Sequence, residues 1–234
     1  MTYNYIKTQI SGHVFELTLA RASKRNAFTP SMVNEIHHAF AQANDNDVVK
    51  LVLIRAEGPV FCAGMDLKTF ENDTLDVQNP LIKNKNISLG EVFDKLYKPS
   101  IALVEGHVIA GGFLIILGCT YVYCTKETQF RLPELALGIF PFQVMASLLK
   151  VLPEKKLLQL CLETAYFDAI KAKELGIVDG FLEEMDIDNQ IKLFESADVN
   201  ALKAGIEALR SLPSMAQENR YQFLKEKLDH LKNR

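Results

Sequence analysis

An uncharged stretch in the middle of the chain, "HVIAGGFLIILGCTYVYC" from His107 to Cys124, limits the possible folds more than any other feature. No aspartate, glutamate, lysine or arginine occurs from His107 until Lys126. A membrane-spanning helix needs about 20 consecutive apolar residues, and this stretch barely reaches that length. It also carries a glycine pair near one end and hydroxyl side chains near the other. We therefore expect a buried segment of a soluble domain and no membrane span.

The composition is that of an ordinary globular protein. The chain has 234 residues, of which 48% are hydrophobic and 24% are charged, as in a typical soluble domain. Its net charge of -3 gives no general attraction to nucleic acid, so we expect no nucleic-acid partner. The four cysteines have apolar neighbours and no C-x-x-C spacing, which favours buried thiols in a reducing compartment over a metal site. The N-terminus lacks the apolar core of a signal peptide, and we expect a cytoplasmic protein.

Segments typical of strands alternate with segments typical of helices. "YIKTQI" and "HVFELTLA" flank a short turn and predict a β-hairpin. Thr29 and Pro30 are typical of a helix start, and "VVKLVLIRA" predicts a strand buried in a parallel sheet. Further strands are expected in "PSIALVEG" and "TYVYCT", and helices in "GGFLIILGC" and "FQVMASLLKVL". The pattern predicts an α/β domain followed by helices, with a mobile loop near a site at residues 72–90.

Two glycine-containing corners follow the expected parallel strands. They are "FCAGMDL" after "KLVLIRA" and "EGHVIAGGFL" after "PSIALV". Ligands of open α/β sheets bind beyond the carboxyl ends of the strands. Glycine at the start of a helix leaves backbone N–H groups free to point outward, and two of them could hold one developing negative oxygen. The same glycines would also suit tight turns and close packing, so the residues alone leave both interpretations open.

Glu134 is the most informative carboxylate. It lies in "RLPELALGIFP", between a proline and a run of apolar residues. Such surroundings remove water from a carboxylate and raise its pKa, which suits a general acid or base. A surface glutamate favoured by the dipole at a helix start is the alternative. The five histidines are scattered along the sequence and assemble neither a Ser–His–Asp set nor a metal site.

Four segments, in order, resemble the motifs of the crotonase, or enoyl-CoA hydratase/isomerase, superfamily. They are "RASKRNAFTPSMVNEI", "LVLIRAEGPVFCAGMDL", "KPSIALVEGHVIAGGFLIILGC" and "FRLPELALGIFP". The resemblance covers roughly residues 10 to 185. It implies the crotonase fold, a spiral of ββα units, assembled as a homotrimer or a dimer of trimers. It also implies an acyl-CoA thioester substrate, of which coenzyme A is a part, with no separate cofactor and no metal.

The resemblance also implies roles for individual residues. Glu134 would be the acid/base, and the backbone N–H groups of Ala63 and Gly111 would bind the thioester carbonyl. The loop that meets the coenzyme A nucleotide would contain Ala22, Lys24, Arg25 and Ala27. The remaining substrate-binding positions would be Gly64, Met65, Asp66 and Leu67 in the acyl pocket, together with Leu114 and Phe140.

Leu114 departs from the hydratases of this family, which use two glutamates twenty positions apart. Glu134 matches the second glutamate, but the first falls on Leu114, which carries no proton. One carboxylate is enough to move a proton from carbon 2 to carbon 4 of a 3-enoyl thioester, as in the single-glutamate 3,2-enoyl-CoA isomerases. We therefore expect an isomerase. The alternatives are a hydratase, a decarboxylase acting on a coenzyme A or acyl-carrier-protein thioester, and a non-catalytic acyl-CoA-binding protein.

We divide the chain into a crotonase-like core domain, residues 1–190, and a C-terminal helical section, residues 191–234. The last helix is expected to carry an apolar stripe formed by Tyr221, Leu224, Leu228 and Leu231. The stripe could pack against the domain itself, or, as the resemblance implies, contact another subunit.

Overall fold

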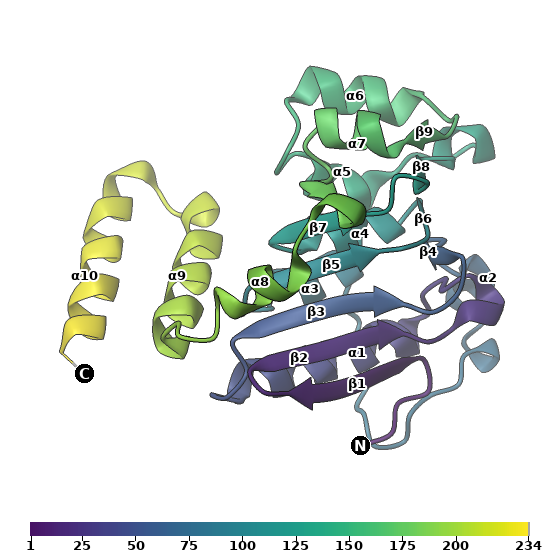
Figure 1. The fold of residues 1–234 in the computed structure, drawn as a ribbon. Coiled ribbons are helices and arrows are strands. Elements are labelled where there is room, and N and C mark those ends of the chain that lie inside the picture. Colours follow the sequence, from purple (N-terminus) through teal and green to yellow (C-terminus); the bar gives the residue numbers. More distant parts are fainter. Residues whose placement is uncertain (234) are drawn as a thin grey trace.

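The larger sheet begins with the predicted hairpin. The computed structural model describes residues 1–233. The turn of the hairpin contains Gly12, whose φ of +56° lies in the left-handed region that favours glycine. After the antiparallel hairpin pair, each further strand is parallel to its neighbour. Within the described residues this sheet has six strands, in the order β1 (Ile6–Ser11), β2 (Val14–Leu19), β3 (Leu51–Ala56), β5 (Ser100–Val104), β7 (Tyr121–Cys124) and β10 (Gly180–Phe181) (Figure 1).

A smaller sheet stands beside the larger one and is built from the strands that alternate with it along the chain. Over residues 1–233 its order is β4 (Val60–Cys62), β6 (His107–Ile109), β8 (Gln129–Arg131) and β9 (Phe167–Asp168). Each repeat thus places one strand in each sheet and then a helix, as in β3–β4, β5–β6 and β7–β8. The helices that follow these pairs are α2 (Leu67–Glu71), α3 (Leu89–Asp94), α4 (Gly112–Gly118) and α5 (Phe142–Leu148). The predicted spiral of ββα units is therefore confirmed.

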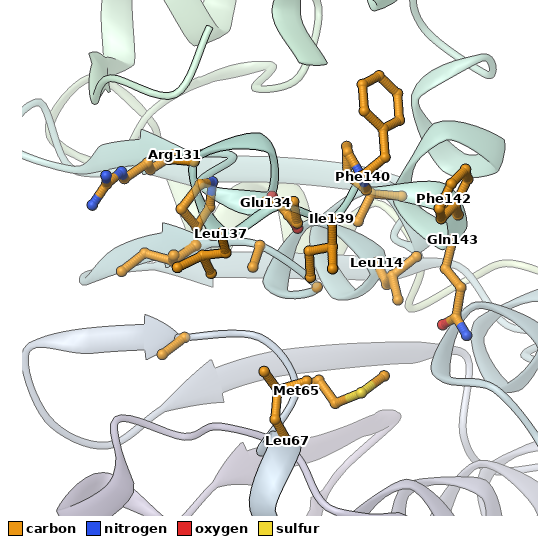
Figure 2. A pocket seen from close by; sticks show the side chains of 18 of the residues that line it. Met65, Leu67, Leu114, Arg131, Glu134, Leu137, Ile139, Phe140, Phe142 and Gln143 are labelled. Atoms are coloured by element: carbon orange, nitrogen blue, oxygen red, sulfur yellow. The ribbon is translucent and has the colours of Figure 1, made fainter. Parts of the chain in front are cut away.

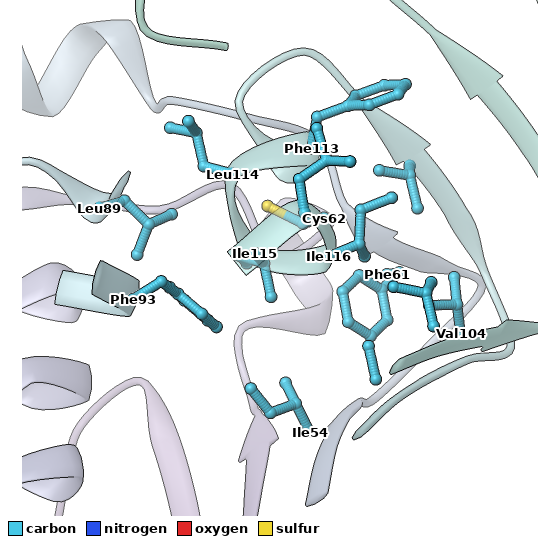
Figure 3. Packing of buried hydrophobic residues seen from close by; sticks show 14 of the residues in the cluster. Ile54, Phe61, Cys62, Leu89, Phe93, Val104, Phe113, Leu114, Ile115 and Ile116 are labelled. Carbon is cyan, nitrogen blue, oxygen red and sulfur yellow. The ribbon is translucent and has the colours of Figure 1, made fainter. Parts of the chain in front are cut away.

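The uncharged stretch divides into three elements: β6, the seven-residue helix α4, and β7. Within residues 1–233, no helix is long and apolar enough to cross a membrane. Phe113, Ile115 and Ile116 of α4 are fully buried and pack among side chains that include Phe61 and Phe93 (Figure 3). The stretch lacks charges because α4 and the neighbouring strands lie in the core.

Both faces of the larger sheet are covered, which explains why its central strands are continuous apolar runs. In β3, Val52 and Ile54 belong to the main core, which includes buried residues of α1 (Pro30–Asp45), α3 and α4. Leu51 and Leu53 belong to a second cluster on the opposite face, against which Ile187 and Ile191 of α8 (Ile187–Lys192) pack.

The predicted start of the first long helix is confirmed in its details. The side chain of Thr29 accepts a hydrogen bond from the Met32 N–H over 3.1 Å, and Pro30 is the first helical residue. This arrangement satisfies one of the N–H groups that a helix start leaves without a partner.

Residues 72–90, expected to form a mobile loop near a site, are tied to the rest of the domain by hydrogen bonds, and their mobility stays a prediction. The Asp76 carboxylate accepts hydrogen bonds from the Ser31 N–H over 2.7 Å and the Tyr5 hydroxyl over 2.9 Å. The Lys85 N–H donates to the Asn34 side chain over 2.7 Å. These bonds hold the segment against α1 and the N-terminal strand, and none of its residues lines the cavity described below.

The chain ends in helices beside the sheets (Figure 1). Arg210 on α9 donates to the backbone oxygen of Phe93 over 2.7 Å and so ties this section to the core. Leu224 and Leu228 line a groove against α9, whereas Tyr221 is exposed. A subunit contact through this surface, and a domain boundary at residue 190, which falls inside α8, stay predictions. The helices after α5 are α6 (Glu154–Leu162), α7 (Ala169–Glu174), α8, α9 (Val199–Ser211) and α10 (Arg220–Lys232).

Candidate active site

A cavity of about 540 Å³ lies where the ends of β4, β6 and β8 meet residues 133–144 (Figure 2). The three strands are parallel, so their carboxyl ends meet at one edge of the smaller sheet. This is the edge at which α/β sheets usually bind ligands. Both predicted glycine corners and Glu134 contribute to the lining. The tertiary structure therefore brings the two corners and the carboxylate to one place.

Gly64 and Gly111 allow the two corners to touch. A Cβ atom on Gly64 would lie only 2.7 Å from the Ala110 Cβ and 3.0 Å from the Gly111 nitrogen. The φ of Gly64 is also +88°, a conformation that side chains other than glycine rarely adopt. Gly64 is thus required both by its backbone and by the close approach of the second corner. This contact is the close packing of the second interpretation, and it also brings the two corners together beside the cavity.

The predicted oxyanion donor Ala63 needs correction. Its N–H donates to the backbone oxygen of Arg25 over 3.0 Å and is not free to bind a ligand. On the same corner, the Gly64 carbonyl and the Asp66 N–H both bond to Phe28, at 2.8 and 2.9 Å.

The intervening Met65 N–H points away from Phe28, because neighbouring groups of a parallel pair alternate in direction. Among residues 1–233, neither the Met65 N–H nor the Gly111 N–H has an acceptor, and both residues line the cavity. The N–H groups of Met65 and Gly111 are therefore free donors, one on each corner, that belong to residues lining the cavity.

Glu134 is buried, with only 8% of its surface exposed. It begins the short 3-10 helix Glu134–Leu137, which ends at Gly138 with a φ of +75°. Among the described residues its Oε2 has no hydrogen-bond partner. Burial raises the pKa of this carboxyl above its ordinary value, and its own backbone N–H partly opposes the rise. The alternative of an exposed glutamate at a helix start is thereby excluded, and a proton acceptor of raised basicity faces the cavity.

Leu114 lies on α4 and points into the same cavity, beside Ile139 (Figure 2). Its side chain is 2% exposed. Within residues 1–233, Glu134 is the only carboxylate that lines the cavity. The position predicted to lack a second acid is therefore part of the site, and no other acid of the described chain replaces it.

Sequence and structure comparisons agree with this geometry. The model of a family described as enoyl-CoA hydratase/isomerase matches residues 9–228. The chain belongs to the enoyl-CoA hydratase/isomerase family. A solved enoyl-CoA hydratase/isomerase from Marinobacter aquaeolei superposes with a TM-score of 0.85 at 20% identity, covering 98% of this chain and 92% of that one. An enoyl-CoA hydratase/isomerase from Mycobacterium paratuberculosis gives a TM-score of 0.81 at 20% identity over 98% and 91% of the chains. The predicted crotonase fold is confirmed.

Curated proteins that are similar in sequence to this chain are named for several different activities. A putative enoyl-CoA hydratase of Thermus thermophilus is 28% identical over 91% of this chain and 86% of the relative. A carnitinyl-CoA dehydratase of Citrobacter koseri is 29% identical over 92% and 83%. A peroxisomal fatty acid beta-oxidation multifunctional protein of Oryza sativa is 28% identical over 79% of this chain. The chain spans about a quarter (26%) of that longer protein.

The substrate-binding positions implied by the family divide into two groups. Those that line the cavity are Arg25, Met65, Leu67, Leu114 and Phe140. Those outside the lining are Ala22, Lys24, Ala27, Gly64 and Asp66. Asp66 instead forms an ion pair with Arg21 over 2.8 Å, which holds the first corner against the preceding loop. Contact of either group with substrate stays a prediction.

Sequence reasoning missed several residues of the site. Arg131 stands between buried Phe130 and Leu132, and this alternation was a signal that it faces away from the core. Tyr166, whose ring lies against the guanidinium of Arg131, also lines the cavity, but nothing in its local sequence indicates this. Gln143 lies on α5 beside the cavity (Figure 2), and its neighbours likewise gave no sign of it.

Proposed function

We propose that this member of the family is a 3,2-enoyl-CoA isomerase with Glu134 as its single acid/base. The reaction moves the double bond of a 3-enoyl thioester to position 2. The carboxylate of Glu134 takes a proton from carbon 2, and the electron pair moves onto the thioester oxygen to form a dienolate. The same carboxyl then returns the proton at carbon 4. No atom is gained or lost, and the carboxylate is regenerated.

The backbone donors would hold the negative oxygen of the dienolate. The free N–H groups of Met65 and Gly111 belong to corners in direct contact, and both line the cavity with Glu134. Donors that are fixed before the reaction stabilise developing charge without reorganisation. The proposal therefore assigns to Met65 the role first predicted for Ala63, and keeps Gly111.

The observation that carries the proposal is the single carboxylate. Adding water to a 2-enoyl thioester by the family's two-glutamate route needs a second acid, and Leu114 occupies that position. Transfer of one proton between two carbons needs only one carboxyl. The apolar side chains of Leu67, Leu114 and Phe140, which line the cavity with Glu134, also suit an apolar acyl chain and disfavour a bound water.

A hydratase or dehydratase is the second candidate, favoured by the printed names of the relatives in Thermus thermophilus and Citrobacter koseri. A decarboxylase and a non-catalytic acyl-CoA-binding protein are further alternatives. The buried carboxylate with its raised pKa speaks against both, because neither needs a proton acceptor at position 134.

The purified protein should isomerise 3-hexenoyl-CoA faster than it hydrates crotonyl-CoA. The physical reason is that one carboxyl can shuttle a proton but has no partner with which to hold and activate water. Spectrophotometry of the two reactions side by side, on one preparation, measures the ratio. Faster hydration of crotonyl-CoA than isomerisation of 3-hexenoyl-CoA would remove the isomerase assignment.

Leu114→Glu should raise the hydratase-to-isomerase ratio by restoring a second carboxyl. The expected gain is modest, because water also needs space and hydrogen bonds. Two buried carboxylates repel each other, so the pKa of one should rise further, and a charge in place of a buried leucine should lower the free energy of unfolding. Leu114→Gln is the matched control, polar but without a proton to transfer. Equal ratios in these two folded variants would contradict a role for position 114 in choosing the reaction.

A further inference from the structure

Most of the charged side chains that line the cavity are cationic. Arg25 and Arg131 both line it, whereas its one carboxylate within residues 1–233 is Glu134, whose burial favours the neutral form. The proposed catalysis uses neither arginine. Two cations and a single carboxylate give the lining of this cavity a positive balance that an anionic ligand would offset.

Arg131 is held in place before any ligand arrives. It ends β8, and its Nε donates to the backbone oxygen of Thr164 over 2.8 Å. Its guanidinium carbon lies 5.1 Å from the centre of the Tyr166 ring, within the range of a cation–π contact. The Tyr166 ring in turn meets the ring of His107 edge-on, with 6.5 Å between centres. One hydrogen bond and one aromatic face thus fix the orientation of the guanidinium.

The outer nitrogens of Arg131 are available to a ligand. Of the described residues, none offers a carboxylate within 4.0 Å of this guanidinium, and neither terminal nitrogen has a hydrogen-bond acceptor. A planar guanidinium with free, fixed donors matches the oxygens of phosphate or carboxylate in pairs.

The two ends of the cavity differ in chemistry, and this selects the anion. Figure 2 shows Arg131 on one side of Glu134 and Leu114 and Phe142 on the other. The acyl chain and the carrier arm leave a thioester in opposite directions. An apolar acyl chain belongs at the end with Leu114 and Phe142, so the carrier arm is directed toward Arg131.

We propose that Arg131 binds the phosphate groups of the carrier arm of the thioester, with Tyr166 as its positioning residue. This rests on the thioester substrate of the proposed function. The phosphates could belong to coenzyme A or to the phosphopantetheine of an acyl carrier protein, which share this chemistry. A carboxylate on the acyl group is the other anion that Arg131 could bind, and the experiment distinguishes this possibility from phosphate binding.

The test measures binding of unreactive thioesters by calorimetry, so it does not depend on turnover. Arg131→Gln should weaken hexanoyl-CoA by about tenfold, the scale of a lost charge-assisted hydrogen bond. Binding of S-hexanoylpantetheine, which has the same acyl group and no phosphate, should stay unchanged. The matched control is Arg55→Gln, which removes the same charge beside Glu16 and Glu105, outside the cavity lining. It should leave both affinities at the wild-type value.

A second pair of variants tests the positioning role. Tyr166→Phe keeps the aromatic face and should bind hexanoyl-CoA as wild type does, whereas Tyr166→Leu should weaken it several-fold without affecting S-hexanoylpantetheine. Hexanoyl-[acyl carrier protein] distinguishes the carriers. A loss in Arg131→Gln for hexanoyl-CoA alone assigns Arg131 to the phosphates of coenzyme A, and a loss for hexanoyl-[acyl carrier protein] alone assigns it to the phosphopantetheine of that protein; either loss supports the phosphate assignment.

Three results would overturn the proposal. They are unchanged binding of both hexanoyl-CoA and hexanoyl-[acyl carrier protein] in Arg131→Gln, an equal loss for S-hexanoylpantetheine, and a loss for adipoyl-CoA, whose acyl group ends in a carboxylate, without a loss for either hexanoyl thioester, which would assign Arg131 to an acyl carboxylate. A protein that binds hexanoyl-CoA through Arg131 but does not isomerise 3-hexenoyl-CoA would keep this proposal and refute only the proposed reaction.

Discussion

Glu134→Gln should lower isomerase turnover by about 10²–10⁴-fold, the usual contribution of a positioned acid/base. Glutamine keeps the shape of the side chain but accepts no proton from carbon 2. Acyl-CoA binding should persist, because the oxyanion donors belong to the backbone of Met65 and Gly111. Turnover of 3-hexenoyl-CoA and the Kd of hexanoyl-CoA, measured on the same protein, separate these effects. Glu154→Gln, on an exposed face of α6, is the control and should retain full activity.

The pH dependence of the wild type follows from the raised pKa of Glu134. In the proposed mechanism the ionised carboxylate is the base. The rate should therefore fall as the pH drops through this pKa, and that fall should begin above the ordinary range of a glutamate. Residual turnover in the glutamine variant should lose this acid limb. A variant with near wild-type turnover, or with an unchanged acid limb, would show that Glu134 is not the base.

The contribution of Glu134 to the free energy of unfolding should change with pH in the direction opposite to the rate: it should increase as the pH drops. Burial favours protonated Glu134, so its pKa is higher in the folded than in the unfolded chain. The corresponding stabilisation is fully present below the unfolded pKa and is lost as the pH rises through the folded pKa. Glutamine carries no charge at any of these pH values. At neutral pH, Glu134→Gln should therefore unfold at a temperature no lower than the wild type does.

Gly111→Pro should lower turnover by about 10²–10³-fold, the typical cost of losing one oxyanion donor. Proline has no backbone N–H, and the φ of Gly111, -58°, already lies in the range that its ring requires. The left-handed Ala110 before it, with a φ of +52°, is the point at which the ring could strain the corner. Circular dichroism must therefore confirm that the variant is folded before its rate is interpreted.

Gly111→Ala is the matched control for this loss. Its added Cβ would lie 2.8 Å from a ring carbon of Phe28, so it introduces crowding on the same side but keeps the N–H. We expect the alanine variant to retain much more activity than the proline variant. Similar losses in both would assign the effect to crowding, and a fully active, folded proline variant would remove Gly111 from the site.

The elements of the fold could be predicted from the sequence where local chemistry decides them. Thr29 and Pro30 start α1 because a side-chain acceptor and a missing N–H suit a helix start in any context. The apolar runs of β3 and β5 predicted strands covered on both faces, and Leu51 and Val52 do pack against opposite layers. The hydrogen-bond partners of loop 72–90 could not be predicted, because polar composition does not say which surface supplies them.

Some features of the candidate site could likewise be predicted from the sequence, and others could not. The burial and raised pKa of Glu134 could be predicted because its proline and apolar neighbours follow it wherever it lies. The identity of the free backbone donor next to Gly64 could not be predicted from the sequence. Whether Ala63 or Met65 has a free N–H depends on the loop that packs alongside, where Arg25 and Phe28 take the other backbone groups.

The resemblance to the family marked Leu114 as the position without a second acid. By itself, the sequence determined the alternation of strands and helices, the two glycine corners and the buried acid. These depend on backbone preferences and on hydrophobicity, which act over a few neighbouring residues. Only the tertiary structure decided that Met65 supplies the free donor, and that Arg131 lies over Tyr166. Both depend on hydrogen bonds and contacts between segments far apart in the chain, whose directions are set when the two sheets pack together.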